Sequence, residues 1–338
     1  MRTTLFAVWS GLLLGACATV GGAPAVGGAV EPTADEQAAL ARVGSKGKGT
    51  VVWSSARNGN HDLFLINLDG SGLKQLTQGD QVDWFSRFAP DGKRILFTRS
   101  KQGFVYERDC NKNWLWDLYL INVDGTDPKL VAKDASWGTW IDDQRILFSR
   151  ATKVYSLELA SGRETLLVDS EQVTGLGGAE LQQPQLSPDG KYLAITLRGS
   201  KRETGILELE NKVWTKTGEG CQINWTPVGD KIYWVNQSGN GGSEVFLMPV
   251  TSGKPTREYS VEELRYIDIP GRRSHEYFPQ LSRDGKWLVW AATARGHDHD
   301  IADYEIYLWQ VGAPASEATR LTFHSSNDRW PDILLASP

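Results

Sequence analysis

Two histidines and two aspartates stand side by side near the C-terminal end of the chain. They form the run His297-Asp298-His299-Asp300, and His275 lies about twenty residues earlier. Imidazole and carboxylate groups together suit a transition metal, and the hard oxygen ligands extend the choice to manganese or calcium. We therefore treat His297, His299, Asp300 and His275 as candidate ligands of a divalent metal ion. The zinc spacing His-Glu-x-x-His is absent, so a polar loop cluster that binds a protein or a glycan is the alternative.

A second set of residues combines acids with basic neighbours. Asp83, Glu276 and Asp328 each stand at the start of a short apolar segment, with His275 directly before Glu276 and Arg329 directly after Asp328. A guanidinium group can bind an anion through two parallel hydrogen bonds. We expect Asp83, His275, Glu276, Asp328 and Arg329 to contact a ligand or a partner.

The sequence contains no recognised nucleophile motif. A Gly-x-Ser-x-Gly elbow and a phosphate-binding glycine loop are both missing from the 338 residues. We predict no catalytic residue, and the sequence favours a binding protein over an enzyme without deciding between them.

Composition narrows the choice of partners further. The formal net charge of −5 gives no basis for binding nucleic acid or an anionic membrane surface. The chain has 14 tryptophans, and large aromatic rings usually bury most of their surface. For Trp84 and Trp330 we expect packing inside the fold, with sugar stacking as the alternative.

The three cysteines divide into one near the N-terminus and two far along the chain. Cys17 follows an apolar run, Leu5 to Leu14, that is too short to span a bilayer as a helix. The ending Leu14-Gly15-Ala16-Cys17 resembles a bacterial lipobox, which implies lipidation of Cys17 and, with Ala18 next, an outer-membrane lipoprotein facing the periplasm or the cell surface. In an oxidising compartment Cys110 and Cys221 can form a disulfide, which would hold the insertion around Cys110 over the centre of the fold.

One phrase recurs along the chain and predicts the architecture. Ser187-Pro188-Asp189-Gly190-Lys191 precedes an apolar run, and close variants begin at Ala89 and Ser282. Asp-Gly turns between short strands, repeated every 40 to 50 residues or so, are typical of a β-propeller. We expect an all-β, six-bladed β-propeller whose innermost strands lie at 83–89, 136–141, 182–187, 222–226, 276–282 and 328–333.

The two ends of the chain are expected to complete one blade together. The segment 49–55 reads as a second strand without a first, and 328–333 as a first strand without a second. Pairing them would close the ring and remove open sheet edges. The predicted organisation is a lipoprotein signal at 1–17, a flexible tether with a short helical segment at 18–48, and the propeller at 49–336.

The segments 65–77 (Leu-Ile-Asn-Leu-Asp-Gly-Ser-Gly-Leu-Lys-Gln-Leu-Thr) and 186–194 resemble the repeats of TolB-type propellers. The resemblance covers about residues 49–336 and implies the fold, because this repeat occurs in binding proteins, lyases and peptidase side-domains alike. TolB itself is a soluble periplasmic protein with an α/β domain before its propeller, which this chain lacks.

These observations lead to one leading functional expectation and one alternative. The leading one is a monomeric, lipid-anchored propeller of the cell envelope that binds an envelope protein or a polysaccharide through its loop-rich face, without catalysis. The alternative is an enzyme similar to metal-dependent polysaccharide lyases, in which a metal offsets a uronate carboxylate and a basic group removes a proton. That alternative requires the divalent metal, whereas the binding scaffold needs no cofactor.

Overall fold

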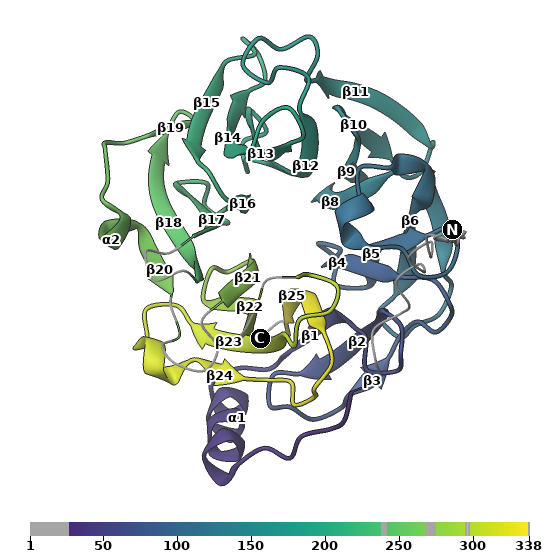
Figure 1. Cartoon of the computed structure of the whole chain (residues 1–338), viewed down its shortest axis with the longest axis vertical. Coiled ribbons are helices and arrows are strands. Elements are labelled where there is room, and N and C mark those ends of the chain that lie inside the picture. Colours follow the sequence, from purple (N-terminus) through teal and green to yellow (C-terminus); the bar gives the residue numbers. More distant parts are fainter. Residues whose placement is uncertain are drawn as a thin grey trace, which may run out of the picture.

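The chain forms short antiparallel sheets arranged around a common centre, which is the architecture of an all-β propeller (Figure 1). The computed structural model describes residues 27–237, 242–267, 269, 275–294, 296 and 298–336. The lipidation candidate Cys17 and the metal candidate His297 lie outside the described residues.

Four sheets have four strands each. Their strands, from the innermost outward, are β4 (Asp83–Phe88), β5 (Arg94–Ser100), β6 (Trp116–Asn122), β7 (Lys129–Lys133); β8 (Ser136–Asp142), β9 (Arg145–Arg150), β10 (Lys153–Glu158), β11 (Arg163–Asp169); β12 (Glu180–Leu186), β13 (Tyr192–Arg198), β14 (Glu203–Glu208), β15 (Trp214–Gly218); and β25 (Asp328–Leu335), β1 (Gly49–Ser55), β2 (Asp62–Asn67), β3 (Lys74–Gln75). In the last sheet, β25 pairs antiparallel with β1, so strands from the two ends of the chain share one blade.

The fifth sheet has nine strands and differs from the expected pattern of six separate blades. One parallel pair, Ser243 with His275, joins β18 to β21 and merges two antiparallel groups. Its strands are β16 (Cys221–Trp225), β17 (Lys231–Gln237), β18 (Ser243–Thr251), β19 (Lys254–Pro255), β20 (Arg265–Ile267), β21 (His275–Leu281), β22 (Trp287–Thr293), β23 (Glu305–Gln310) and β24 (Thr319–Arg320). The short helices are α2 (Val261–Leu264), η1 (Glu107–Asp109), η2 (Asn113–Leu115) and η3 (Ala315–Glu317).

The repeated phrase forms a turn whose side chains bond to its own backbone. Asp189 Oδ1 accepts hydrogen bonds from Ser187 Oγ at 2.6 Å and from Lys191 N at 3.1 Å. Gly190 follows with φ +72°, a left-handed conformation that glycine adopts without a steric penalty. The copy at Ser282 repeats both bonds at the same distances, so both copies of the phrase form the same type of turn.

Each innermost strand contains one residue in the left-handed region and a break in its pairing register. The φ values lie between 53° and 61°, and the residues are Phe85, Trp137, Gln183, Gln222, Phe278 and Trp330. A left-handed residue other than glycine costs about 1–3 kcal/mol and persists only where its surroundings hold it. Such bulges re-aim side chains, and here they bring residues of neighbouring sheets into contact.

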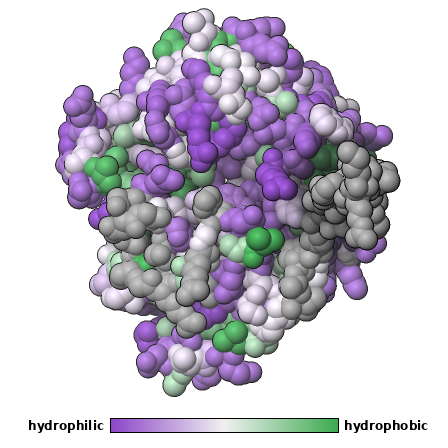
Figure 2. Space-filling model, viewed as in Figure 1, coloured by the Kyte–Doolittle hydropathy of each residue, from purple (hydrophilic) through white to green (hydrophobic). Residues whose placement is uncertain are grey.

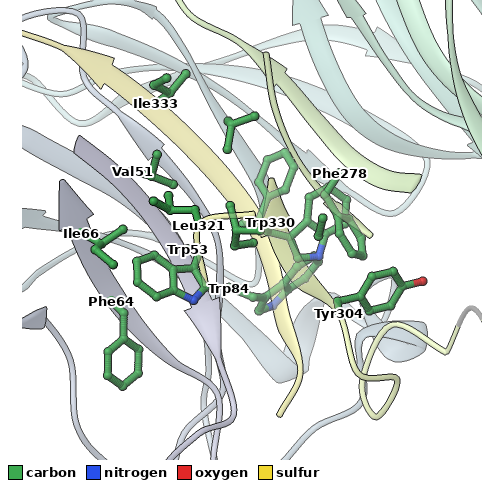
Figure 3. Close-up of a cluster of buried hydrophobic side chains, with 14 of the residues drawn as sticks. Val51, Trp53, Phe64, Ile66, Trp84, Phe278, Tyr304, Leu321, Trp330 and Ile333 are labelled. Carbon is green, nitrogen blue, oxygen red and sulfur yellow. The ribbon is translucent and has the colours of Figure 1, made fainter. Parts of the chain in front are cut away.

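Four of these residues form a compact group that we call the aromatic plug: Phe85, Trp137, Phe278 and Trp330. Ring centroids are 4.9 Å apart for Phe85 and Trp137, 5.0 Å for Phe85 and Trp330, and 4.4 Å for Phe278 and Trp330. Trp84 packs on the plug, 4.5 Å from Trp137, and Figure 3 shows Trp84, Phe278 and Trp330 within one buried cluster. The expected packing role of Trp84 and Trp330 is confirmed, since both are almost fully buried.

The segment expected to be a flexible tether contains a packed helix, α1 (Ala34–Lys46). Thr33 and Glu36 form a capping box at its start, which stabilises a helix N-terminus. Leu40 and Val43 are buried, and the helix lies beside β24 (Figure 1). Residues 27–48 are therefore held against the propeller, because the apolar face of α1 needs a surface to cover it. None of the helices in the described part of the chain is long and apolar enough to cross a membrane.

Candidate functional site

A cavity of about 360 Å³ opens where the innermost strands begin, and we call it the central pocket. Inner strands β8, β12 and β16, the end of β13 and two loops supply its lining. The lining residues are Glu107, Arg108, Cys110, Asn111, Trp137, Gln182, Gln183, Arg198, Cys221, Gln222, Asp298, His299 and Asp300. Hydrophilic residues predominate on the face visible in Figure 2. Pockets of this size hold small molecules or the end of a chain.

One wall of the pocket comes from the insertion between β5 and β6, which we call the 101–115 loop. Glu107 of this loop is buried and reaches the neighbouring sheets. Its carboxylate accepts hydrogen bonds from Trp330 Nε1 at 2.7 Å and Arg329 Nη1 at 3.1 Å, and lies 2.8 Å from His299 Nδ1. The loop is therefore fixed over the start of β25 by one acid with three partners.

Asp300 completes the same network from the other side. Its carboxylate accepts the backbone N–H of Glu107, at 3.0 and 3.1 Å for its two oxygens, and Arg329 Nη1 at 2.8 Å. Arg329 also donates to the carbonyl oxygen of His299 at 2.7 Å. Arg329 is fully buried, and its Nε and Nη2 have no partner within the described residues. Two loops distant in sequence are thus joined through one buried guanidinium.

Electrostatics within this network fix the charge of its members. Burial acts to raise the pKa of Glu107, but the charge and hydrogen bond of His299 and the charge of Arg329 outweigh it, so the pKa lies below its ordinary value. His61 is buried near Arg329, and burial together with that positive charge holds its pKa well below the ordinary value. Glu107 is therefore ionised and His61 neutral at pH 7.

The predicted contact residues lie at the starts of their strands, but they are not on the surface. Asp83, Glu276, Asp328 and Arg329 are each at most 1% exposed. Arg99 Nε and Nη2 each lie 2.7 Å from an oxygen of Asp83, which ties the first two strands of that blade together. Because a buried charge needs a partner inside the fold, these side chains are engaged within the protein, and their contact with a ligand or partner stays a prediction.

Asp328 and Glu276 show the same internal pairing. Arg57 Nη2 lies 3.0 Å from an oxygen of Asp328, and Glu276 accepts the backbone N–H of Ile269 at 3.0 Å. His275, the remaining predicted contact, is half-buried at the parallel bridge to β18. The repeat thus places acids at strand starts as links within the sheets.

The predicted metal ligands are only partly brought together. His299 and Asp300 are adjacent, but both bond within the Glu107 and Arg329 network. Among the residues that the structure describes, no group of three histidine, cysteine or acidic side chains could hold a metal ion. Because His297 lies outside those residues, the metal site stays a prediction.

The predicted disulfide is not formed, and Cys110 and Cys221 are free thiols. Both nevertheless line the central pocket, as the expected position of the insertion implied. Cys110 is engaged elsewhere, since Gln182 Nε2 donates to its Sγ at 3.2 Å. Burial raises the pKa of both thiols. The 101–115 loop is held over the pocket by Glu107 rather than by a sulfur bridge.

The sequence pattern did not single out Gln182, Gln183 and Gln222, which line the pocket beside Cys221. Gln182 and Gln183 stand in β12, Cys221 and Gln222 in β16, and the left-handed residue of each pair aligns with Trp330. Aligning the six inner segments would have found these positions, because each left-handed residue follows the strand start by one to three residues. Glu107 carries no such signal, as it lies in an insertion that only one repeat has.

Comparison with known proteins supports the fold and gives one distant sequence relation. No family model matches the chain. Dipeptidyl-peptidase 5 of Porphyromonas gingivalis is 24% identical over 251 residues, which cover 71% of this chain and 34% of the relative. The chain therefore spans about a third of the length of that relative.

Two solved structures are similar in fold. TolB from Acinetobacter baumannii superposes with a TM-score of 0.50 at 16% identity, covering 78% of this chain and 65% of that chain. The TolB-type protein of Agrobacterium tumefaciens gives a TM-score of 0.55 at 16% identity, covering 86% and 99%. The chain has the fold of a TolB-like β-propeller, as the resemblance of its repeats implied.

Proposed function

We propose that this protein is a binding scaffold whose central pocket receives part of a partner. The observation that carries the proposal is the construction of the pocket. Trp137 of the aromatic plug lines it, and the 101–115 loop forms a fixed wall. Its other lining groups are mainly amides and charges, which are the groups that give a binding site its specificity.

We further propose that the disc has six blades and that β25 closes the ring. The nine-stranded sheet divides at its parallel bridge into β16–β17–β18–β20, with the short β19 also paired to β18, and β21–β22–β23–β24. Six inner strands carry a left-handed residue at the same position, as six equivalent blades require. Pairing of β25 with β1 supports closure, since it joins the last strand to the first.

The N-terminal segment is the basis for a proposal about where in the cell the protein lies. We propose that Cys17 is lipidated and anchors a monomeric propeller to the outer membrane, facing the periplasm or the cell surface, without any membrane-spanning helix. The partner is then an envelope protein or an envelope polysaccharide. Mass spectrometry of the mature protein tests the anchor: an acylated Cys17 peptide supports it, and an unmodified or differently cleaved N-terminus contradicts it.

Site-specific crosslinking tests the binding role. A photo-reactive amino acid replaces Arg108, which is exposed at the pocket, or Asp124, which is exposed in an Asp-Gly turn after β6. We expect a discrete crosslinked partner from position 108 in cells and none from position 124. Equal capture from both positions, or capture from neither, would contradict a scaffold that binds through the central pocket.

The relation to dipeptidyl-peptidase 5 favours a second candidate. In this second candidate function, the propeller is the non-catalytic side-domain of a peptidase system and presents peptides to a separate catalytic protein. The purified protein should then show no peptidase activity with dipeptidyl chromogenic substrates while it increases the activity of an envelope fraction from which it was removed. Activity of the purified chain alone would contradict both candidates, because each assigns it no catalysis.

A further inference from the structure

The charged side chains that line the central pocket differ in whether they are paired with other groups of the protein. Glu107 and Asp300 are occupied by Arg329 and, for Glu107, by His299. Asp298 caps the turn that follows it, accepting from the backbone N–H of Asp300 at 2.9 Å. The carboxylates of Glu107 and Asp300 are therefore paired with Arg329, whereas Asp298 is exposed and bonded to the backbone of its own turn.

The two arginines of the lining have no acidic partner among the described residues. Arg198 is half-buried and donates to the carbonyl oxygens of Leu197 at 2.8 Å and Gly220 at 2.9 Å. Arg108 lies 4.3 Å from the ring centroid of Tyr106. A guanidinium held by backbone carbonyls is already oriented, so it loses little entropy when it binds an anion.

The nearest carboxylate on the adjacent strand does not neutralise Arg198. Glu180 of β12 is its register partner, but its carboxylate accepts from Asn111 Nδ2. Burial lowers the pKa of Arg198, and the positive charge of Arg202 acts in the same direction, against the Cys221 thiol. The pocket therefore contains two guanidinium groups, Arg198 and Arg108, without an acidic partner among the described residues.

A buried acceptor stands in the same pocket. Gln183 is 5% exposed, and its Oε1 has no hydrogen-bond partner within the described residues. A buried acceptor without a partner destabilises the folded protein until a donor bonds to it. Gln183 has a left-handed backbone at the register break of β12 and is one of the residues that line the pocket. A ligand that offers an N–H group would satisfy it.

We propose that the central pocket binds the C-terminal end of a peptide chain, with the α-carboxylate on Arg198 and Arg108 and a backbone N–H on Gln183 Oε1. A peptide C-terminus carries both groups a few atoms apart, and the three side chains line the same pocket. A sugar acid also carries a carboxylate, but it would need an open aromatic face, and Trp137 is 2% exposed between Phe85 and Trp84. The inference rests on the proposed binding role of this pocket.

Calorimetry with small peptides tests it on the purified protein. N-acetyl-tri-alanine has the free carboxylate, and its C-terminal amide lacks only that charge. Since one hydrogen bond to a charged group contributes about 1.5–3 kcal/mol, we expect amidation to weaken binding about tenfold or more. R198Q should weaken N-acetyl-tri-alanine to the same degree, with R198K recovering part of the affinity.

The control variant is R42Q, which removes an arginine that is exposed in α1 and does not line the pocket, so it should leave binding unchanged. Equal affinity for acid and amide, an equal loss in R42Q, or binding of galacturonate without binding of the peptide would each overturn the proposal. If the tripeptide does not bind while position 108 still crosslinks a partner, this inference fails and the scaffold role stands.

Discussion

Replacing Glu107 should destabilise the whole propeller, although the residue lies in a loop. Its carboxylate is bonded to Arg329, Trp330 and His299 at 2.7–3.1 Å, and E107A removes all three contacts. Removing one partner of a buried ion pair costs about 3–5 kcal/mol, because the remaining charge is buried without compensation. Asp300 still binds Arg329, so we expect about 3 kcal/mol, the lower end of that range.

The assay is urea unfolding followed by far-ultraviolet circular dichroism, with the midpoint shift as the measure. The matched control is E158Q, whose carboxylate pairs with Arg163 at 3.2 Å while the two side chains are 41% and 75% exposed. Exposed pairs of this kind contribute about 0–1 kcal/mol. Equal midpoint shifts for E107A and E158Q would refute the assignment of the network as a central structural link.

The pH dependence provides a second measure on the same variants. Because the folded-state pKa of Glu107 is lowered from 4.5, its stabilisation is fully present above the unfolded value and is lost as the pH falls through the folded one. The difference between wild type and E107A should therefore be constant from pH 6 to 8 and shrink below about pH 4. A difference that does not change on acidification would mean that the carboxylate charge is not what stabilises the loop.

Burial and the charge of Asp83 raise the pKa of Asp62 to about 7, so the contribution of Asp62 to stability should fall as the pH rises from about 4 to 7. In thermal unfolding, the melting temperature of D62N should therefore rise relative to that of wild type across this pH range. Parallel curves for the two proteins would contradict this. G220A should unfold at a markedly lower temperature than G162A, because a Cβ at Gly220 would meet the carbonyl oxygen of Val235 at 2.0 Å whereas Gly162 has nothing within 4 Å; equal melting temperatures would contradict the tight approach. Deleting 328–338 removes β25 and should abolish cooperative unfolding of the entire disc rather than fray one edge, as differential scanning calorimetry would show. Treatment with EDTA should leave the melting temperature unchanged, because His299 and Asp300 already have partners inside the protein; a fall, with near-stoichiometric metal by elemental mass spectrometry, would support the lyase-like alternative.

The sequence determined the fold because the repeat acts locally. The turn at Ser187 and Asp189 is stabilised by bonds between residues only two apart, so a short motif is enough to specify it. Alternation of these turns with apolar runs then predicts short antiparallel strands, and their number and spacing predict a propeller. The sequence also indicated a short helical segment within 34–46, because a capping box and apolar positions are local signals.

The site depended on contacts between distant parts of the chain. Glu107 meets Arg329 across 222 positions, and no local pattern indicates that meeting. Tertiary structure also reversed the meaning of the strand-start acids: the sequence offered Asp83 and Asp328 as surface contacts, but pairing with Arg99 and Arg57 buries them. The sequence by itself therefore determined the blade, whose stabilising bonds are short-range. Only the tertiary structure decided which polar side chains are used within the protein and which, such as Arg198 and Gln183, line the pocket.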